Sequence, residues 1–188
     1  MNIDMEQILS KLNCISRMAI IENAPNTEKM LIAFTKILKY RYQTENAMVI
    51  AETEIKLAEV LMEYYKTQTN HLIDFEYLDL EKSLSIVFVP HFSLLSFYYC
   101  MLNIFGNTEN QDQMKIQTKV TVKNEKTQID IVFKSNVDME TIYREAYTFV
   151  QDEYVSIKQA IVRIEAAFGA PEVSVHCNNS MMEVQIRI

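Results

Sequence analysis

The residues that could do chemistry in this 188-residue chain are few and widely spaced. Its imidazoles and thiols belong to His71, His91, His176, Cys14, Cys100 and Cys177. Metal sites and disulfide frameworks need such residues in close pairs, and the sequence has no Cys-x-x-Cys pair. His176 and Cys177 are neighbours in a predicted strand, so their side chains point to opposite faces and cannot chelate one ion. We therefore expect no metal site, and reduced, largely buried thiols of the kind found in cytoplasmic proteins.

The glycine content excludes the common phosphate-binding loops. Gly106 and Gly169 are the only two glycines, whereas average usage is roughly 7% of residues. Loops that cradle phosphates need clustered glycines, because only a backbone without Cβ approaches phosphate closely or turns at positive φ. The sequence therefore has no Walker loop, dinucleotide-binding fingerprint or glycine-rich nucleotide lid.

The charge balance argues against nucleic acid as a partner. The formal net charge is -7 and the isoelectric point is near 5.0, so phosphate backbones would be repelled. Lys36, Lys39 and Arg41 form the only basic run, and cations at these positions suit the negative end of a helix dipole. We expect no nucleic-acid binding.

An uncharged stretch over residues 83–108 has the length of a membrane span. Pro90, His91 and Asn103 are among the residues that interrupt it, and its pattern changes from β-rich over 85–89 to helical over 92–105. We predict a strand followed by a core helix, with no membrane insertion. Residues 1–10 include Asp4 and Glu6 and resemble no secretory signal, so we expect a cytoplasmic protein.

The first 46 residues predict an antiparallel helix hairpin. Apolar residues recur at helical spacing over 3–22, and again over 27–42. Pro25 is predicted to interrupt the helical pattern between the two helices, and Thr27 is predicted to start the second helix. A lone hairpin leaves an apolar stripe exposed on each helix, and pairing two hairpins into a four-helix bundle buries both stripes. We therefore predict a homodimer formed through this region.

Residues 47–188 mix helices and strands without regular alternation. Helical patterns cover 51–67, 92–105, 138–150 and 154–168, with Gly169 as a C-terminal cap and Pro171 as a stop. Strand patterns cover 73–80, 85–89, 115–123, 127–133, 172–177 and 182–188. The predicted fold class is α+β: a helix hairpin (1–46) followed by a two-layer α/β sandwich with a mixed sheet (47–188).

Several segments, read in this order, resemble one known family. They are Leu12-Asn13-Cys14-Ile15-Ser16, Thr27-Glu28-Lys29-Met30, Leu38-Lys39-Tyr40, Ile157-Lys158 with Arg163, Phe168-Gly169 and Val184-Gln185-Ile186-Arg187-Ile188. The chain resembles the cytoplasmic core of sensor histidine kinases of the LytS/YesM type. That resemblance implies a dimerisation hairpin followed by an ATPase domain of the GHKL class, with the Bergerat fold.

The catalytic positions of that family are altered here. The family's Asn-Pro-His-Phe-Leu-Phe-Asn segment carries the phosphoacceptor histidine, and an ungapped count places Glu6 there. The N box, Val-Glu-Asn-Ala, supplies a general base and a Mg²⁺ ligand. Anchoring on Pro90 places Tyr99 and Cys100 at those positions, and anchoring on Gly106 places Cys100 and Met101 there. Asn103 lies one turn further on and is the alternative, displaced ligand.

The glycine boxes are altered as well. The family's Asp-x-Gly-x-Gly segment corresponds to residues 133–138, where Asp138 is predicted to cap a helix instead. The later Gly-x-Gly aligns with residues 154–157. Phosphoryl transfer depends on positioning and charge neutralisation, so these changes predict its loss. We expect no cofactor, with ATP and Mg²⁺ only if the altered pocket near Tyr99, Cys100, Met101 and Asn103 still binds them.

Three hypotheses follow. The first is a pseudokinase that regulates by binding a response regulator or a sensor kinase. The second is a phosphotransferase or weak kinase resembling the sporulation phosphotransferases, which needs a histidine on the hairpin, whereas every histidine lies after residue 70. The third is a small-molecule sensor. Its site for an apolar effector would be lined by Tyr98, Tyr99, Met101 and Phe105.

Overall fold

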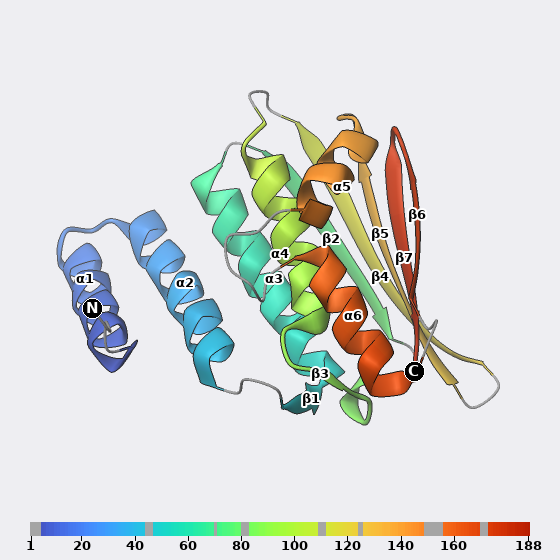
Figure 1. Cartoon of the computed structure of the whole chain (residues 1–188). Coiled ribbons are helices and arrows are strands. Elements are labelled where there is room, and N and C mark those ends of the chain that lie inside the picture. The colour runs from blue at the N-terminus through green and yellow to red at the C-terminus, as the bar shows by residue number, and fades with distance from the viewer. Residues whose placement is uncertain are drawn as a thin grey trace.

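The computed structural model describes residues 5–43, 47–69, 71–79, 83–108, 112–123, 126–148, 156–169 and 173–188. The elements, in chain order (Figure 1), are α1 (Met5–Ile21), α2 (Pro25–Gln43), β1 (Met48–Ile50), α3 (Ala51–Gln68), β2 (Leu72–Asp79), the 3-10 turn η1 (Ser83–Ser85), β3 (Phe88–Pro90), α4 (Ser93–Gly106), β4 (Gln113–Lys123), β5 (Lys126–Ser135), α5 (Met139–Thr148), α6 (Ile157–Phe168), β6 (Val173–Asn178) and β7 (Met181–Arg187).

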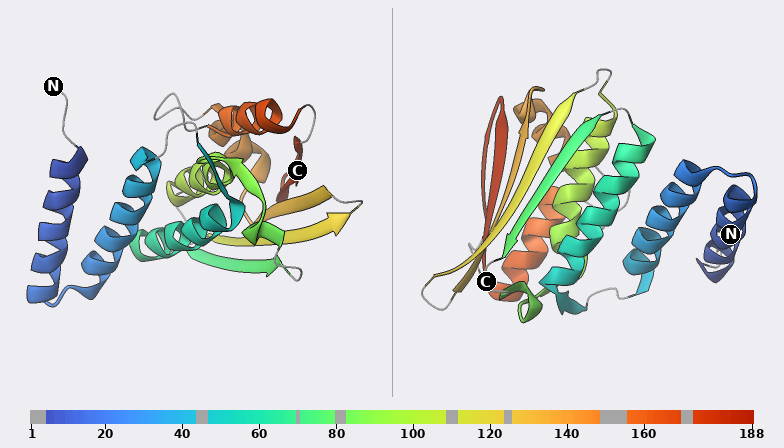
Figure 2. Two further views of the ribbon diagram at one scale, coloured as in Figure 1. Left: turned by 90° about the horizontal axis from the view of Figure 1, so that it is seen from below. Right: turned by 180° about the vertical axis from the view of Figure 1, so that it is seen from behind.

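The main sheet is mixed. Within the described ranges its strand order is β2-β4-β5-β7-β6, and β2 runs parallel to β4 while the other pairs are antiparallel. A parallel pair needs a crossover connection, and α4 lies in that connection. Helices α3 to α6 cover one face of the sheet, and the α1–α2 hairpin stands beside α3 (Figures 1 and 2). The predicted α+β class, with an N-terminal hairpin and a mixed sheet, is confirmed.

The core lies between α4 and the inner face of the sheet. Alternate residues of the central strands point inward and are fully buried, among them Ile116, Ile131 and Val184. From α4, the rings of Phe97 and Tyr98 are fully buried as well. Each large apolar side chain contributes roughly 1.5–3 kcal/mol when buried, so this layer supplies much of the stability. The uncharged segment is therefore a core helix, and none of the described helices is both long and apolar enough to cross a bilayer.

The turn between α1 and α2 differs from the sequence prediction. Asn23 adopts a left-handed conformation (φ 55°), and the N–H of Ala24 donates to the carbonyl of Ala19 at 2.8 Å. This is the geometry of a helix C-terminal cap, in which asparagine substitutes for glycine. Pro25 then begins α2, so the prediction that Thr27 starts the helix was wrong. Proline is tolerated in the first turn because its missing N–H would have no partner there.

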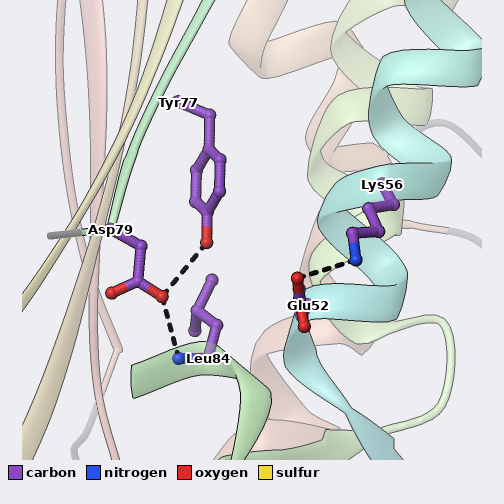
Figure 3. A network of polar contacts seen from close by, with 5 residues as sticks. All are labelled: Glu52, Lys56, Tyr77, Asp79 and Leu84. Carbon is purple, nitrogen blue, oxygen red and sulfur yellow. Dashed lines mark hydrogen bonds and ion pairs between the residues drawn. The ribbon is translucent and has the colours of Figure 1, made fainter. Parts of the chain in front are cut away.

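The region predicted as a strand over 85–89 also differs. Residues Ser83–Ser85 form a 3-10 turn, and the strand β3 begins at Phe88. The Asp79 carboxylate accepts hydrogen bonds from the Leu84 N–H at 3.0 Å and the Tyr77 hydroxyl at 3.1 Å (Figure 3). These bonds tie the turn to the end of β2, which is the physical reason for the shift. The strand β1, which pairs with β3, was not predicted because three residues are too short for a periodic pattern.

The remaining elements follow the predicted order. Gly169 has a φ of 85°, and its N–H donates to the Glu165 carbonyl at 2.9 Å, so its role as a cap is confirmed. The linker at 44–46, the hairpin turn at 124–125, the predicted helix limits at 150 and 154, and the stop at Pro171 lie outside the described residues.

The hydrogen bond between α4 and β4 gives a test of this core. The hydroxyls of Tyr98 and Thr118 are both buried and lie 2.7 Å apart. Tyr98→Phe or Thr118→Val alone leaves one buried hydroxyl unsatisfied, and each should lower the free energy of unfolding by about 1–2 kcal/mol. The double variant should lose less than the sum, because neither hydroxyl remains. Urea unfolding of the four proteins measures the difference, and additive losses would contradict the assignment.

Candidate functional site

Helix α4, which carries the positions that the resemblance aligns with the N box, is in direct contact with α6. Cys100 of α4 is fully buried, and its thiol accepts a hydrogen bond from the backbone N–H of Ile157 at the start of α6. Burial raises the pKa of the Cys100 thiol to about 12, so the thiol is neutral at physiological pH. Met101 is fully buried beside it.

Apolar packing and hydrogen bonds hold helix α6 against the start of α4. Ile157, Ala160 and Ile164 are fully buried along its inner side. The Arg163 guanidinium donates to the carbonyls of His91 and Phe92, both at 3.3 Å. These hydrogen bonds hold α6 in contact with the N-terminal part of α4.

The four residues of the altered pocket do not share one face of α4. Cys100 and Met101 belong to the buried interior, whereas Tyr99 and Asn103 are half-buried and line a cavity shared with α2 and α3. The Asn103 side chain makes a hydrogen bond with the Tyr65 hydroxyl of α3.

The other predicted positions lie apart from α4. Glu6 is exposed in the first turn of α1. Asp138 is exposed and caps α5, because its carboxylate accepts from the Glu140 N–H at 3.1 Å and the Thr141 hydroxyl at 2.6 Å, as predicted. Ser156 caps α6 by accepting the Gln159 N–H at 3.1 Å. The preceding residues 154–155 of the aligned Gly-x-Gly segment lie outside the described residues.

A buried carboxylate that the sequence analysis did not single out lies at the start of α4. Glu54 of α3 is fully buried and accepts hydrogen bonds from the backbone N–H groups of Phe92, Leu94 (2.7 Å) and Leu95 (3.0 Å). The first N–H groups of a helix have no partner within the helix, and a negative charge there also interacts favourably with the helix dipole. Glu54 therefore caps α4 from a neighbouring helix.

The same carboxylate connects the hairpin to the rest of the chain. The Tyr40 hydroxyl of α2 donates to Glu54 at 2.8 Å. The ring of His91 lies 4.4 Å from the Tyr40 ring, centroid to centroid, and its Nε2 is 3.0 Å from the Tyr40 carbonyl. Together with Phe92 and Arg163, these residues form what we call the junction cluster, in which α2, α3, α6 and the start of α4 meet.

The electrostatics of the junction cluster follow from its burial. Burial raises the pKa of Glu54 to about 7, although the four hydrogen-bond donors around it act in the opposite direction. Burial also raises the pKa of Tyr40, and the neighbouring Glu54 charge raises it further. Burial lowers the pKa of Arg163, and the negative charge of Glu54 acts in the opposite direction. The charge of Glu54 thus changes near neutral pH.

A sequence signal for Glu54 existed. Glu54, Ala58, Leu61 and Tyr65 recur at helical spacing, and all four are buried on one side of α3. A carboxylate within an apolar stripe predicts a buried partner, because an unpaired buried charge is strongly unfavourable. The three N–H partners could not be predicted, since they lie about forty residues further along the chain.

The cavity beside Tyr99 has a volume of about 270 Å³ and lies between α2, α3 and α4. The small-molecule hypothesis named Tyr98, Tyr99, Met101 and Phe105 as its lining. Tyr99 lines the cavity, but the other three are fully buried in the core, so that part of the hypothesis was wrong. The physical reason is the helical period: Tyr99 and Asn103 lie on one side of α4, while the sheet covers the other.

The cysteines are dispersed and differ in burial. Cys14, Cys100 and Cys177 form no disulfide with one another, and Cys14 is exposed on α1, so the expectation of largely buried thiols was wrong for that residue. In the part of the chain that the structure describes, no group of three or more histidine, cysteine, aspartate or glutamate side chains could hold a metal ion.

Comparisons with known proteins give a distant likeness in three dimensions. No family model matches the chain, and no curated protein matches it in sequence. Similar solved structures include the catalytic domain of the histidine kinase ThkA (TM-score 0.45, 14% identity, 76% of this chain and 95% of that one). The histidine kinase domain of a blue-light activated kinase from Erythrobacter litoralis EL346 gives a TM-score of 0.43 at 9% identity over 97% of this chain and 94% of that one.

A bacterial phosphotransferase is similar to the same degree, with a TM-score of 0.44 and 13% identity over 89% of this chain and 77% of that one. A likeness of this degree concerns the fold alone.

The raised pKa of Glu54 gives a prediction with a definite sign. Because the folded-state pKa (about 7) lies above the ordinary value of 4.5, the folded protein binds the proton more tightly than the unfolded chain. Relative to Glu54→Gln, the wild type should therefore lose stability as pH rises from about 4.5 through about 7, by about 3 kcal/mol in total. Urea unfolding of both proteins between pH 4.5 and 8 measures this difference.

The matched control is Glu59→Gln, which removes an exposed carboxylate from the same helix. Its stability difference from the wild type should change little over the same range. A difference between wild type and Glu54→Gln that is independent of pH would contradict the assignment.

Proposed function

We propose that this chain is a non-catalytic regulatory protein of bacterial two-component signalling. In this proposal, residues 1–46 form a dimerisation hairpin, and residues 47–188 form a degenerate domain related to histidine kinase ATPase domains. The protein acts in the cytoplasm by binding a response regulator or a sensor kinase. It transfers no phosphoryl group itself.

The observation that carries the proposal is the closure of α6 onto α4. Phosphoryl transfer needs a metal ligand, a base and donors arranged around a triphosphate. At the corresponding part of α4 stand the neutral thiol of Cys100 and the thioether of Met101, and the Ile157 N–H already donates to Cys100. Arg163, a cation that could have faced phosphate, donates to the carbonyls of His91 and Phe92.

The sequence of the hairpin supports the part of the proposal in which this chain transfers no phosphoryl group. The residue aligned with the phosphoacceptor is Glu6, and no histidine occurs before His71. A carboxylate cannot form a phosphohistidine. An exposed acid in the first turn of α1 instead interacts favourably with the helix dipole. The phosphotransferase hypothesis keeps the scaffold but has no imidazole on α1 or α2.

Nucleotide binding is tested by isothermal titration calorimetry of the full chain with Mg-ATP, with Mg-ADP and magnesium chloride as controls. We expect no heat above the controls, because the α4–α6 contact would have to open. Micromolar affinity for Mg-ATP would overturn the proposal. Incubation with a phosphorylated response regulator tests the alternative, since radiolabel transferred to this chain would establish a phosphotransferase.

The proposed homodimer rests on apolar surface that α1 leaves uncovered. Among the described residues of α1, Ala19 alone is buried, while Ile15, Met18 and Ile21 are 47%, 51% and 83% exposed. A solvent-exposed apolar stripe of this kind on a helix that packs against a single neighbour suits a four-helix bundle made from two hairpins.

The double variant Ile15→Asp/Met18→Asp should convert the dimer into a monomer of 22.0 kDa, because four carboxylates would enter one interface. Light scattering coupled to size-exclusion chromatography measures the mass. Ser10→Asp/Asn13→Asp is the matched control, since it adds the same charge to other exposed positions of α1. A wild type that is monomeric at micromolar concentration would contradict the dimer.

A further inference from the structure

The cavity of about 270 Å³ is built jointly by the hairpin and the sandwich. Helix α2 contributes Ile37, Leu38 and Arg41, and the C-terminal halves of α3 and α4 contribute the opposite walls. Figure 2 shows α2 lying beside α3 along this side of the molecule. Phe34 is 41% exposed and also lines the cavity, so one edge of it reaches the surface.

Five aromatic side chains are among the residues that line the cavity: Phe34, Tyr64, Tyr65, Phe92 and Tyr99. Phe34 and Tyr64 have ring centroids 6.3 Å apart, and Phe92 and Tyr99 have theirs 6.4 Å apart. Tyr64 and Tyr65 meet edge to face at 5.4 Å. Aromatic side chains prefer such tilted and edge contacts at 4.5–7 Å, and a further ring placed among them would gain the same interaction.

One wall depends on a glycine. A Cβ at Gly106 would lie 3.2 and 3.3 Å from two ring carbons of Tyr65, closer than ordinary contact. Only two glycines occur in the chain, and this one lets α4 accept the Tyr65 ring, whose hydroxyl bonds to Asn103. The ring is therefore held in place by packing and by a hydrogen bond, which preorganises the wall.

The charge of the lining is opposite to that of the protein. The chain has 25 acidic and 18 basic residues, yet the described residues that line the cavity include Arg41 and no aspartate or glutamate. Burial raises the pKa of Tyr99, and the positive charge of Arg41 acts against that increase. A cation, phenol hydroxyls and the Asn103 amide favour an anionic oxygen group over a cationic one.

The volume limits the size of the ligand. A cavity of about 150 Å³ lined by apolar residues accepts benzene. The larger volume here has room for one aromatic ring with a short side chain. We propose that the cavity between α2, α3 and α4 is a binding site for a small aromatic carboxylate, with its ring among Phe34, Tyr64 and Tyr99 and its carboxylate at Arg41.

Such a ligand would hold the hairpin against the sandwich. Its binding needs the α2 wall and the α3–α4 wall at the same time, so it stabilises the arrangement in which both are present. This site is independent of the proposed function, because it requires neither a dimer nor the absence of nucleotide binding. Its failure and the failure of the proposed function are therefore measured separately.

The test uses 3-phenylpropanoate as the probe and its amide, 3-phenylpropanamide, as the neutral control. Isothermal titration calorimetry of the full chain should give a dissociation constant of about 1 mM or tighter for the acid. The amide should bind about tenfold more weakly, because it lacks the charge that Arg41 pairs with. Octanoate, an aliphatic acid, should also bind about tenfold more weakly if the rings select for aromatic ligands.

Three variants locate the site. Arg41→Gln should weaken binding of the acid about tenfold and leave binding of the amide unchanged. Lys39→Gln removes the same charge from an exposed position of α2 outside the cavity and should change affinity by less than about twofold. Leu38→Trp fills the cavity and should abolish binding, with circular dichroism used to check that each variant folds.

Equal affinity for the acid and the amide, or an unchanged affinity in Arg41→Gln, would overturn the anionic specificity. Binding that survives in a folded Leu38→Trp would overturn the location. If no member of a set of aromatic carboxylates binds at up to about 10 mM, the site itself is refuted.

Discussion

The Glu54 carboxylate is the contact on which the arrangement of helices depends. The first turn of α4 lies in the interior, because Ser93 to Tyr98 are all buried, so water cannot satisfy its N–H groups. Each buried N–H without an acceptor costs about 1–3 kcal/mol. Glu54 accepts three of them from a different helix, and its position therefore fixes how α3 lies against α4. The cost of burying the carboxylate is reflected in its raised pKa.

The turn that leads into α4 is strained and is stabilised by the same cluster. Phe92 has a φ of 60°, a left-handed conformation that is unfavourable for a bulky residue by roughly 1–2 kcal/mol. Its N–H bonds to Glu54, its carbonyl accepts from Arg163, and its ring stacks on Tyr40 at 6.3 Å. Because Arg163 belongs to α6, the bonds that support this turn also bring α6 onto α4. The contact between α6 and the start of α4 is therefore a consequence of the junction cluster.

Much of the fold could be predicted from the sequence, and the misses have a common cause. Helical spacing located α1, α3 and α4, and alternation located the strands of both β-hairpins, because those patterns are local. The start of α2 at Pro25 depended on a cap formed by Asn23, and β1 exists only because β3 lies opposite it. The family positions assigned to Glu6, Cys100 and Asp138 rest on the sequence resemblance, and their loss of function stays a prediction. The cavity could not be predicted, since its walls come from helices that are distant in the sequence.

Helix α2 contacts the sandwich at two neighbouring places, and this links the polar and aromatic parts of the interface. Tyr40 donates to Glu54, while Ile37 and Arg41, one turn and one residue away, line the cavity. A rigid helix cannot move at one of these places without moving at the other. The hydrogen bond from Tyr40 is stronger to an ionised carboxylate than to a neutral acid, so the charge of Glu54 affects how firmly α2 is held. By linkage, a ligand in the cavity that holds α2 more firmly is expected to affect, and be affected by, the protonation of Glu54.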